Sequence, residues 1–332
     1  MNVWCIVSSM RAEPLRAVTP EEINAFHRDG AVLIKGVLSR EWIDVVREGI
    51  DAAIAEPDQY SGLAGVELRV DQFPASRSAG LRRIIEDSPV AEISGSALRS
   101  PVRFYMDQGF YKSKGMISPT PWHQDTCYYN IDGHELIRAW VSADPAPRNI
   151  ALEFVRGSHL WNVTYRPLAG RDPELDAEAR TLLDNAPTDR PMLDARAHED
   201  WTYFRGVRDT RLPPVPDIES HRDSYEIIGW EYEPGDVILF HGNILHSALG
   251  NVSLPHPRRA HASLWAGQDV HYLHRPGQII PDPPALFAHE PKTGQPLSDF
   301  PDVFPLAWSP GNWRPRHRRL FPHATARRSN SR

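Results

Sequence analysis

Two histidines and one aspartate in this chain have the residue types of a three-ligand metal site. The string PTPWHQDTCYY contains His123 and Asp125, two positions apart. In an extended segment alternate side chains share a face, so this imidazole and this carboxylate can reach one ion. An HxD triplet is also common by chance, and taken alone it equally fits a loop histidine beside a solvated acid.

A second string, far downstream, offers the third ligand. In EPGDVILFHGNILHSALGN, residues 236–240 are predicted as a buried strand, and His241 and His246 follow it. Two histidines and one carboxylate occupy one side of an octahedral metal and leave three positions open, which is the arrangement of non-haem Fe(II) oxygenases. The two strings together therefore predict a metal site with room for reactants.

A pair of arginines follows in HPRRAHASLWAG, where Arg258 and Arg259 begin a strand of small and apolar residues. An arginine inside a barrel is costly to bury without an anion, and the carboxylate of a co-substrate would serve. Side chains alternate along a strand, so we expect one of the two arginines to face solvent. The alternative is that both point to solvent at the mouth of the strand.

The elements that must position these residues are helical first and β-rich afterwards. One helix is predicted to begin at a Thr19–Pro20 cap, and a second follows Ser39 with an apolar face that should pack on a sheet. From about residue 101, short β-type runs are separated by Pro, Gly, Asn and Asp. This pattern predicts a mainly β fold with flanking helices, a double-stranded β-helix of the jelly-roll or cupin-like kind.

The composition narrows the class of partners. The 332 residues hold 37 Lys plus Arg against 43 Asp plus Glu, a net charge of -6, which argues against a nucleic-acid partner. No apolar run approaches the roughly 18 residues of a membrane span, and no signal-peptide pattern is present, so we expect a cytoplasmic protein away from the membrane. Two cysteines, Cys5 and Cys127, are too few for a disulfide framework. No pattern indicates an oligomeric state.

These strings resemble the phytanoyl-CoA dioxygenase family of Fe(II)/2-oxoglutarate oxygenases. The resemblance runs from about Val18 to Val270 and includes TPEEINAFHRDGAVLIKGVLS, PTPWHQD, RAWVSADP, ALEFVRGSH, PGDVILFHGNILHSALGN and RRAHASLWAG. Its specific part is the order and spacing of the HxD triplet relative to the later histidine and arginine.

The resemblance implies a role for each matching residue. The implied iron ligands are His123, Asp125 and His246. Arg258 matches the residue that binds the distal carboxylate of 2-oxoglutarate, and His241 matches a nearby histidine that is not a ligand. Lys112 and Trp140 match positions near the co-substrate pocket, although they could also be a solvated lysine and a core tryptophan.

The implied cofactors are Fe(II), 2-oxoglutarate as co-substrate, and O2. 2-Oxoglutarate would be decarboxylated to succinate and CO2 while an unactivated C–H bond of a small organic substrate is hydroxylated. Hydroxylation is favoured because Asp125 is retained, whereas related halogenases have a small residue there. The substrate could be an acyl-CoA or a secondary metabolite, and its pocket could be lined by Tyr128, Tyr129, His134 and Trp161.

Two other classes of protein fit the same three ligands. A zinc or other divalent-metal hydrolase would use metal-bound water as its nucleophile, but it has no need of a buried cation such as an inward-facing Arg258. A non-catalytic metal-binding or ligand-binding barrel is the third class, and the intact set of three ligands argues against it.

The predicted organisation has one dioxygenase domain at residues 19–276. It comprises a helical part at 19–100, a barrel core at 101–162 and 224–276, and a lid-like insertion at 163–223. An N-terminal extension covers residues 1–18, and a Pro-rich segment with a basic tail covers 277–332. One position departs from the family pattern: Asn149 stands where the family often has glycine, and we expect a positive φ there.

Overall fold

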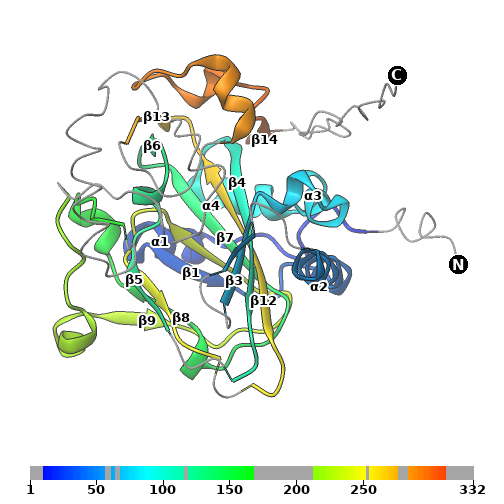
Figure 1. Ribbon diagram of the computed structural model, residues 1–332, viewed down its shortest axis with the longest axis vertical. Helices are drawn as coiled ribbons and strands as arrows, with labels where there is room; N and C mark the ends of the chain where they lie inside the picture. Colours follow the sequence, from blue (N-terminus) through cyan, green and yellow to red (C-terminus); the bar gives the residue numbers. More distant parts are fainter. Residues whose placement is uncertain are drawn as a thin grey trace, which may run out of the picture.

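Two larger β-sheets, a two-stranded ribbon and a set of helices make up the described part of the chain (Figure 1). The structure is a computed structural model, and it describes residues 10–56, 61–63, 68–115, 119–167, 212–251, 254–275 and 283–311. Within these ranges, no helix has both the length and the apolar character required to cross a membrane.

Among the described residues, the α-helices come early in the chain, as predicted. They are α1 (Pro20–Asp29), α2 (Arg40–Ala55), α3 (Ala79–Glu86) and α4 (Val90–Leu98). At the start of α1, the Thr19 hydroxyl accepts from the backbone N–H of Glu22, whose carboxylate accepts from the backbone N–H of Thr19. This reciprocal cap satisfies two N–H groups that the first turn leaves open, and it confirms the predicted helix start.

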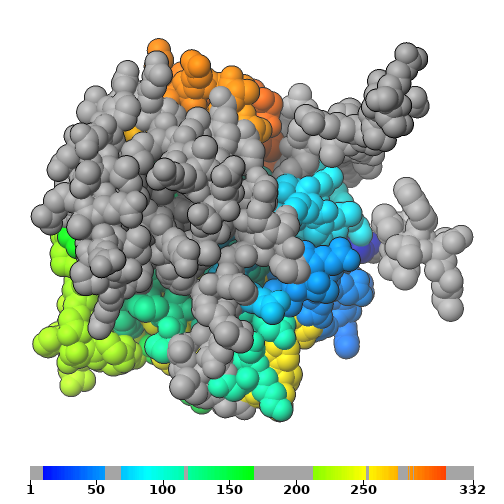
Figure 2. Space-filling view, viewed as in Figure 1, coloured from blue at the N-terminus to red at the C-terminus, as the bar shows by residue number. Residues whose placement is uncertain are grey.

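Helix α2 packs on the outer face of the large sheet. Its residues Ile43, Val46 and Ile50 are buried in a cluster that includes outward-facing residues of that sheet. Ile50 lies over Gly109 of strand β4 (Val102–Lys112), where an added Cβ would come within 2.7 Å of the Ile50 Cδ1 atom. The opposite side of α2 is on the molecular surface (Figure 2). The predicted packing of this helix on a sheet is confirmed.

The larger sheet is antiparallel throughout. In spatial order its strands are β1 (Ala31–Ile34), β10 (Val237–His241), β7 (Leu136–Ser142), β12 (Arg258–Ala266), β4 (Val102–Lys112), β3 (Leu68–Gln72) and β2 (Ser61–Leu63), with β14 (Leu306–Trp308) also paired to β4. Strands from distant parts of the sequence thus lie side by side at its centre, which is how residues near 110, 140 and 260 come together.

The smaller sheet carries His123 and His246, whereas His241 ends β10 of the larger sheet. Its strands, in spatial order, are β5 (Thr120–His123), β11 (His246–Ala248), β8 (Leu152–Val155) and β9 (Ile227–Gly229). A separate two-stranded ribbon pairs β6 (Ile131–Asp132) with β13 (His271–Tyr272). Short 3-10 turns lie at Pro74–Ser76, Thr126–Tyr128, Arg148–Ile150, Ser158–Trp161, Glu219–Ser224, Pro284–His289 and Leu297–Asp299.

The two sheets face each other across a shared apolar core. Inward-facing residues of the large sheet and of the small sheet form one buried cluster, which includes Trp140, Ile238, Phe240, Ala260, Ala262, Leu152, Phe154 and Ala248. The described strands pair within each sheet but do not join the two sheets into a closed barrel. Two facing antiparallel sheets with flanking helices agree with the predicted jelly-roll fold.

Two expectations from the sequence need comment. The predicted positive φ at Asn149 is wrong, because this residue lies inside the 3-10 turn Arg148–Ile150; the described non-glycine residues with positive φ are Phe73, Arg99, Asn162 and Glu290. Of the predicted lid at 163–223, only residues 163–167 and 212–223 are among the described residues, and the rest lies outside them. The basic tail from residue 312 also lies outside the described residues.

Candidate metal centre and co-substrate pocket

The two motif histidines lie on neighbouring strands of the small sheet. His123 ends β5, His246 begins β11, and the antiparallel register places them directly opposite each other. Their ring centroids are 4.2 Å apart. Side chains at directly opposite positions of paired strands project from the same face, so both imidazoles point into the space between the sheets.

Asp125 reaches the same point from the turn after β5. Its backbone N–H donates to the carbonyl of Gly242 at 3.0 Å, which ties this turn to the loop between β10 and β11. Its Oδ1 atom lies 3.7 Å from the Nε2 atoms of both His123 and His246. The three possible ligand atoms are all within 4.8 Å of one another, so these buried side chains could hold one metal ion. Their role as ligands stays a prediction.

Backbone carbonyls orient both rings. The Nδ1 atom of His123 lies 2.7 Å from the carbonyl oxygen of Pro121, and that of His246 lies 3.1 Å from the carbonyl oxygen of Ile244. A carbonyl oxygen can only accept, so each Nδ1 carries the proton and each Nε2 presents its lone pair. Partners of this kind fix the tautomer and the orientation of metal-binding histidines.

The electrostatics of the site favour the protonation states that bind a metal. Burial, together with neighbouring His246, lowers the pKa of His123 to about 3, and burial also lowers the pKa of His246. Burial raises the pKa of Asp125, but Arg138 and the two histidines outweigh it, so this pKa lies below its ordinary value. At neutral pH the site therefore contains two neutral imidazoles and one carboxylate.

Arg138 is a site residue that the sequence analysis missed. It lies on β7 with 3% of its side chain exposed, and its Nη1 atom forms an ion pair with Asp125 Oδ2 at 3.2 Å. The sequence did contain a signal: Arg138 precedes Trp140 by two positions within the apolar run LIRAWVSA. Alternation places both side chains on the inner face of the strand, where an arginine requires a reason.

Arg258 and Lys112 form a second polar group in the space between the sheets. They are directly opposite each other on β12 and β4, and their residues are 2% and 3% exposed. Arg258 donates through Nη1 to the carbonyl of Ile150, while its buried Nη2 has no partner among the described residues. Within the described ranges, neither cation has a carboxylate partner within 4.0 Å.

Lys112 extends from the large sheet to the small one. Its Nζ atom lies 3.1 Å from the carbonyl oxygen of Leu249 and 3.4 Å from Thr120 Oγ1. Thr120 and Leu249 are each three residues from a motif histidine, which is roughly 10 Å along a strand. Burial, and then the charge of Arg258, hold the pKa of Lys112 well below its ordinary value. The two cations thus lie in the same interior as the three possible ligands.

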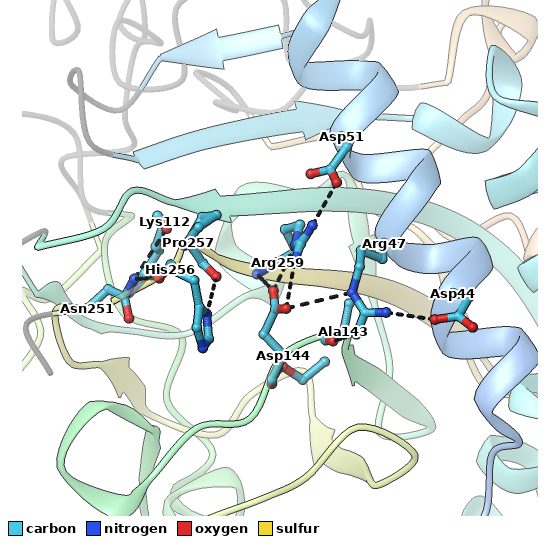
Figure 3. A network of polar contacts seen from close by, with 11 residues as sticks. Asp44, Arg47, Asp51, Lys112, Ala143, Asp144, Asn251, His256, Pro257 and Arg259 are labelled. Atoms are coloured by element: carbon cyan, nitrogen blue, oxygen red, sulfur yellow. Dashed lines mark hydrogen bonds and ion pairs between the residues drawn. The ribbon is translucent and has the colours of Figure 1, made fainter. Parts of the chain in front are cut away.

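Arg259, in contrast, is held outside this interior. It forms ion pairs with Asp144 at 2.7 Å and with Asp51 of α2 at 2.6 Å (Figure 3). The adjacent arginines therefore face opposite sides of the large sheet, as strand alternation predicted. Each has a different environment: Arg259 has two carboxylates, and Arg258 has a single carbonyl among the described residues.

Trp140 lies with these groups on the inner face of the large sheet. Its ring packs against Phe110, with centroids 4.9 Å apart. His241 is placed elsewhere: its Nε2 atom lies 2.7 Å from the carbonyl oxygen of His134, and its Nδ1 accepts from the backbone N–H of Asn243. His241 therefore supports the turn beside the site and is not in the ligand cluster, in agreement with the resemblance.

The suggested pocket residues have different positions. Tyr128 packs edge-on against His123, with centroids 5.9 Å apart, and the hydroxyl of Tyr129 accepts from Arg138 at 2.8 Å. Both tyrosines are thus next to the site. Trp161 is 39% exposed and lies against Tyr225, with ring centroids 6.3 Å apart.

A comparison with known protein families agrees with this geometry. The family model for phytanoyl-CoA dioxygenase matches residues 26–260, which is most of the chain. The chain belongs to the phytanoyl-CoA dioxygenase family. It is accordingly a 2-oxoglutarate-dependent non-haem iron oxygenase, and the predicted enzyme class and the cofactors Fe(II), 2-oxoglutarate and O2 are confirmed.

Similar curated proteins include two ectoine dioxygenases. This family member is 23% identical over 257 residues to the ectoine dioxygenase of Sphingopyxis alaskensis, an alignment that covers 73% of each chain. It is 20% identical over 249 residues to that of Nocardia farcinica, covering 73% of this chain and 75% of the relative. These identities leave the substrate open.

Solved structures share the fold. The 2-oxoglutarate-dependent epimerase SnoN from nogalamycin biosynthesis superimposes with a TM-score of 0.61 at 19% identity, covering 87% of this chain and 98% of SnoN. EctD from S. alaskensis in its apo form gives a TM-score of 0.56 at 16% identity, covering 83% and 92% of the two chains. The jelly-roll fold predicted from the sequence is thereby confirmed.

Proposed function

We propose that this family member hydroxylates a small organic molecule at an unactivated C–H bond, with Fe(II) held by His123, Asp125 and His246. Arg258 and Lys112 would bind the distal carboxylate of 2-oxoglutarate, and Trp140 would form part of the wall of that pocket. When bound, the iron and the co-substrate supply the oxidising chemistry that no side chain can provide. The domain limits 19–276 and a cytoplasmic location are part of the same proposal.

One observation carries this proposal: two cations are buried in the interior that contains the possible ligands, and the described residues offer them no carboxylate. A buried Nη2 without a partner is costly, and a buried Lys112 beside it adds like-charge repulsion. A dicarboxylate would relieve both, because guanidinium binds carboxylate through two parallel hydrogen bonds. A metal hydrolase has no use for this cation pair, which makes that alternative the weaker one.

The protein's own residues then have defined tasks. His123 and His246 present neutral Nε2 lone pairs held by backbone carbonyls, and Asp125 supplies the single negative charge. Arg258 and Lys112 orient the co-substrate from the opposite sheet. Apolar neighbours such as Phe110 exclude water from the space between them, which strengthens each charge interaction.

The substrate is the least constrained part of the proposal. Relatives with the name ectoine dioxygenase make a small polar metabolite the first candidate, ahead of an acyl-CoA, for which no recognition cluster is present in the sequence. SnoN, of the same fold, is an epimerase, so the product must be identified as well as the substrate.

The proposal is tested by measuring succinate release across a panel of metabolites that includes ectoine and acyl-CoA thioesters. With Fe(II), ascorbate and 2-oxoglutarate, the true substrate should raise succinate release above the uncoupled background, and its product should be heavier by one oxygen. A product of unchanged mass would replace hydroxylation with epimerisation. Failure to consume 2-oxoglutarate with or without any substrate would contradict the proposed function itself.

Binding of 2-oxoglutarate should be accompanied by proton uptake. Lys112 has a pKa well below its ordinary value in the free protein, because of burial and Arg258, and a bound dianion would raise this pKa. Affinity should therefore fall as pH rises between the low pKa of the free state and the higher pKa of the complex, by at most about tenfold per pH unit. Calorimetry in buffers of different ionisation enthalpy measures the protons taken up.

The matched variant for this measurement is Lys112→Met, which keeps an unbranched side chain one heavy atom shorter and removes its titration. It should bind 2-oxoglutarate more weakly at low pH and lose the proton uptake. Equal proton uptake in Lys112→Met and in the natural sequence would show that another group takes the proton.

A further inference from the structure

Arg138 contacts Asp125, the only carboxylate among the three proposed ligands. Asp125 presents Oδ1 at 3.7 Å from the Nε2 atoms of both His123 and His246, and its other oxygen, Oδ2, lies 3.2 Å from Arg138 Nη1. The two oxygens of this carboxylate thus have separate neighbours.

Arg138 is itself firmly held on the inner face of β7. Its Nη1 atom donates to the hydroxyl of Tyr129 at 2.8 Å, its Nη2 atom donates to Gln108 Oε1, and its guanidinium lies over the ring of Phe110 at 5.9 Å from the centroid. With 3% of the side chain exposed, it has no alternative position in solvent. A guanidinium held in this way can fix the carboxylate that it contacts.

The direction of the hydrogen bonds supports a fixed arrangement. Arginine has only donors, so Gln108 must turn its oxygen to Arg138 and its NH2 group to Gln72, whose Oε1 accepts at 2.9 Å. Gln72, Gln108 and Arg138 form a buried row from β3 through β4 to β7 that ends at Asp125. Each amide orientation in the row follows from the arginine.

We propose that Arg138 is a positioning residue that holds Asp125 with Oδ1 turned toward the two histidines, so that the carboxylate is already oriented to bind the metal through this one oxygen. The inference rests on the proposed function. A six-coordinate metal with two histidines and a one-oxygen carboxylate keeps three open positions, enough for a chelating keto acid and O2. A carboxylate that turned both oxygens to the metal would occupy one of those positions.

The test is cobalt binding to the full chain without co-substrate, measured by calorimetry with Co(II) chloride as the probe. Arg138→Met should weaken binding by about 10- to 100-fold, the usual effect of losing a group that orients a metal ligand. Arg138→Lys keeps the charge but not the planar fork, so it should fall between Arg138→Met and the natural sequence. If Arg138 only balances the charge of Asp125, Arg138→Met should instead bind cobalt more tightly, because removing a cation near a divalent ion tightens binding.

The matched control is Arg259→Met, which removes an equally well-paired arginine on the other face of the same sheet. It should lower the melting temperature through loss of the Asp144 and Asp51 ion pairs and leave cobalt affinity unchanged. If Arg138→Met does not fold, Gln108→Leu and Tyr129→Phe each remove one hydrogen bond that holds Arg138, and both should weaken cobalt binding by a few fold.

The outcomes separate the two proposals. If Arg138→Met binds cobalt as tightly as the natural sequence, or more tightly, the positioning role is overturned and the proposed function is left intact. Unchanged cobalt affinity in both Gln108→Leu and Tyr129→Phe would have the same meaning. A natural sequence that binds no cobalt would contradict the metal centre itself.

Discussion

Asp125→Ala should abolish the uncoupled consumption of 2-oxoglutarate. This change removes the only negatively charged ligand and leaves two neutral imidazoles, which bind a divalent ion much more weakly. We expect succinate formation under Fe(II) and ascorbate to fall to the level of the protein-free control. Calorimetry with Co(II) should show the loss of metal binding directly, so that the result does not depend on turnover alone.

The control for this variant must separate a lost ligand from a damaged fold. Asp125→Ala also removes the ion-pair partner of the buried Arg138. Breaking a buried ion pair in this way destabilises a folded protein by about 3–5 kcal/mol. Asp144→Ala provides the comparison, because it removes a buried aspartate paired with Arg259 outside the site. It should lower the melting temperature while uncoupled turnover persists. Turnover that survives in folded Asp125→Ala would refute the assignment of this ligand.

Arg258→Ala should raise the KM for 2-oxoglutarate by about 30-fold to 4000-fold. Truncating one partner of a buried, hydrogen-bonded charge pair costs about 2–5 kcal/mol, and each 1.4 kcal/mol is about tenfold in affinity. The effect should be on KM rather than on kcat, since Arg258 holds the co-substrate at the end away from the metal. Initial rates over a range of 2-oxoglutarate concentrations measure both constants.

The neighbouring arginine makes this test specific. Arg259→Ala removes a guanidinium from the next position of the same strand, but its partners are Asp144 and Asp51 on the outer face (Figure 3). It should change stability and leave the KM for 2-oxoglutarate within a few fold of its normal value. Equal effects of the two substitutions would mean that damage to β12, rather than loss of a carboxylate partner, explains the Arg258 result.

The sequence allowed most of the candidate site to be predicted because its signals are local. Spacing of two in HxD, a histidine after a buried strand, and an arginine at the start of the next strand are patterns that a reader can find without coordinates. Strand alternation also predicted that only one of Arg258 and Arg259 would face inward. The helix start at Thr19 was readable for the same reason, since its cap lies within four residues.

Arg138 was missed because no local sequence pattern links it to its partner Asp125. Its ion pair with Asp125 joins β7 to a turn after β5, in different sheets. An arginine in an apolar strand is visible in the sequence, but the carboxylate that neutralises it is not. Asn149 failed for a related reason: the 3-10 turn of residues 148–150 sets its φ, and no local pattern predicted that turn.

The amino-acid sequence by itself determined which side chains are chemically able to bind iron and a dicarboxylate. It also determined the β-rich class of the fold and the face on which each strand residue lies. These properties depend on residue type and on the two-residue period of a strand. Only the tertiary structure decided that His123 lies opposite His246, that Lys112 lies opposite Arg258, and that Arg138 contacts Asp125. Each of these depends on strand register or sheet stacking between segments that are distant in the sequence, and no local pattern encodes it.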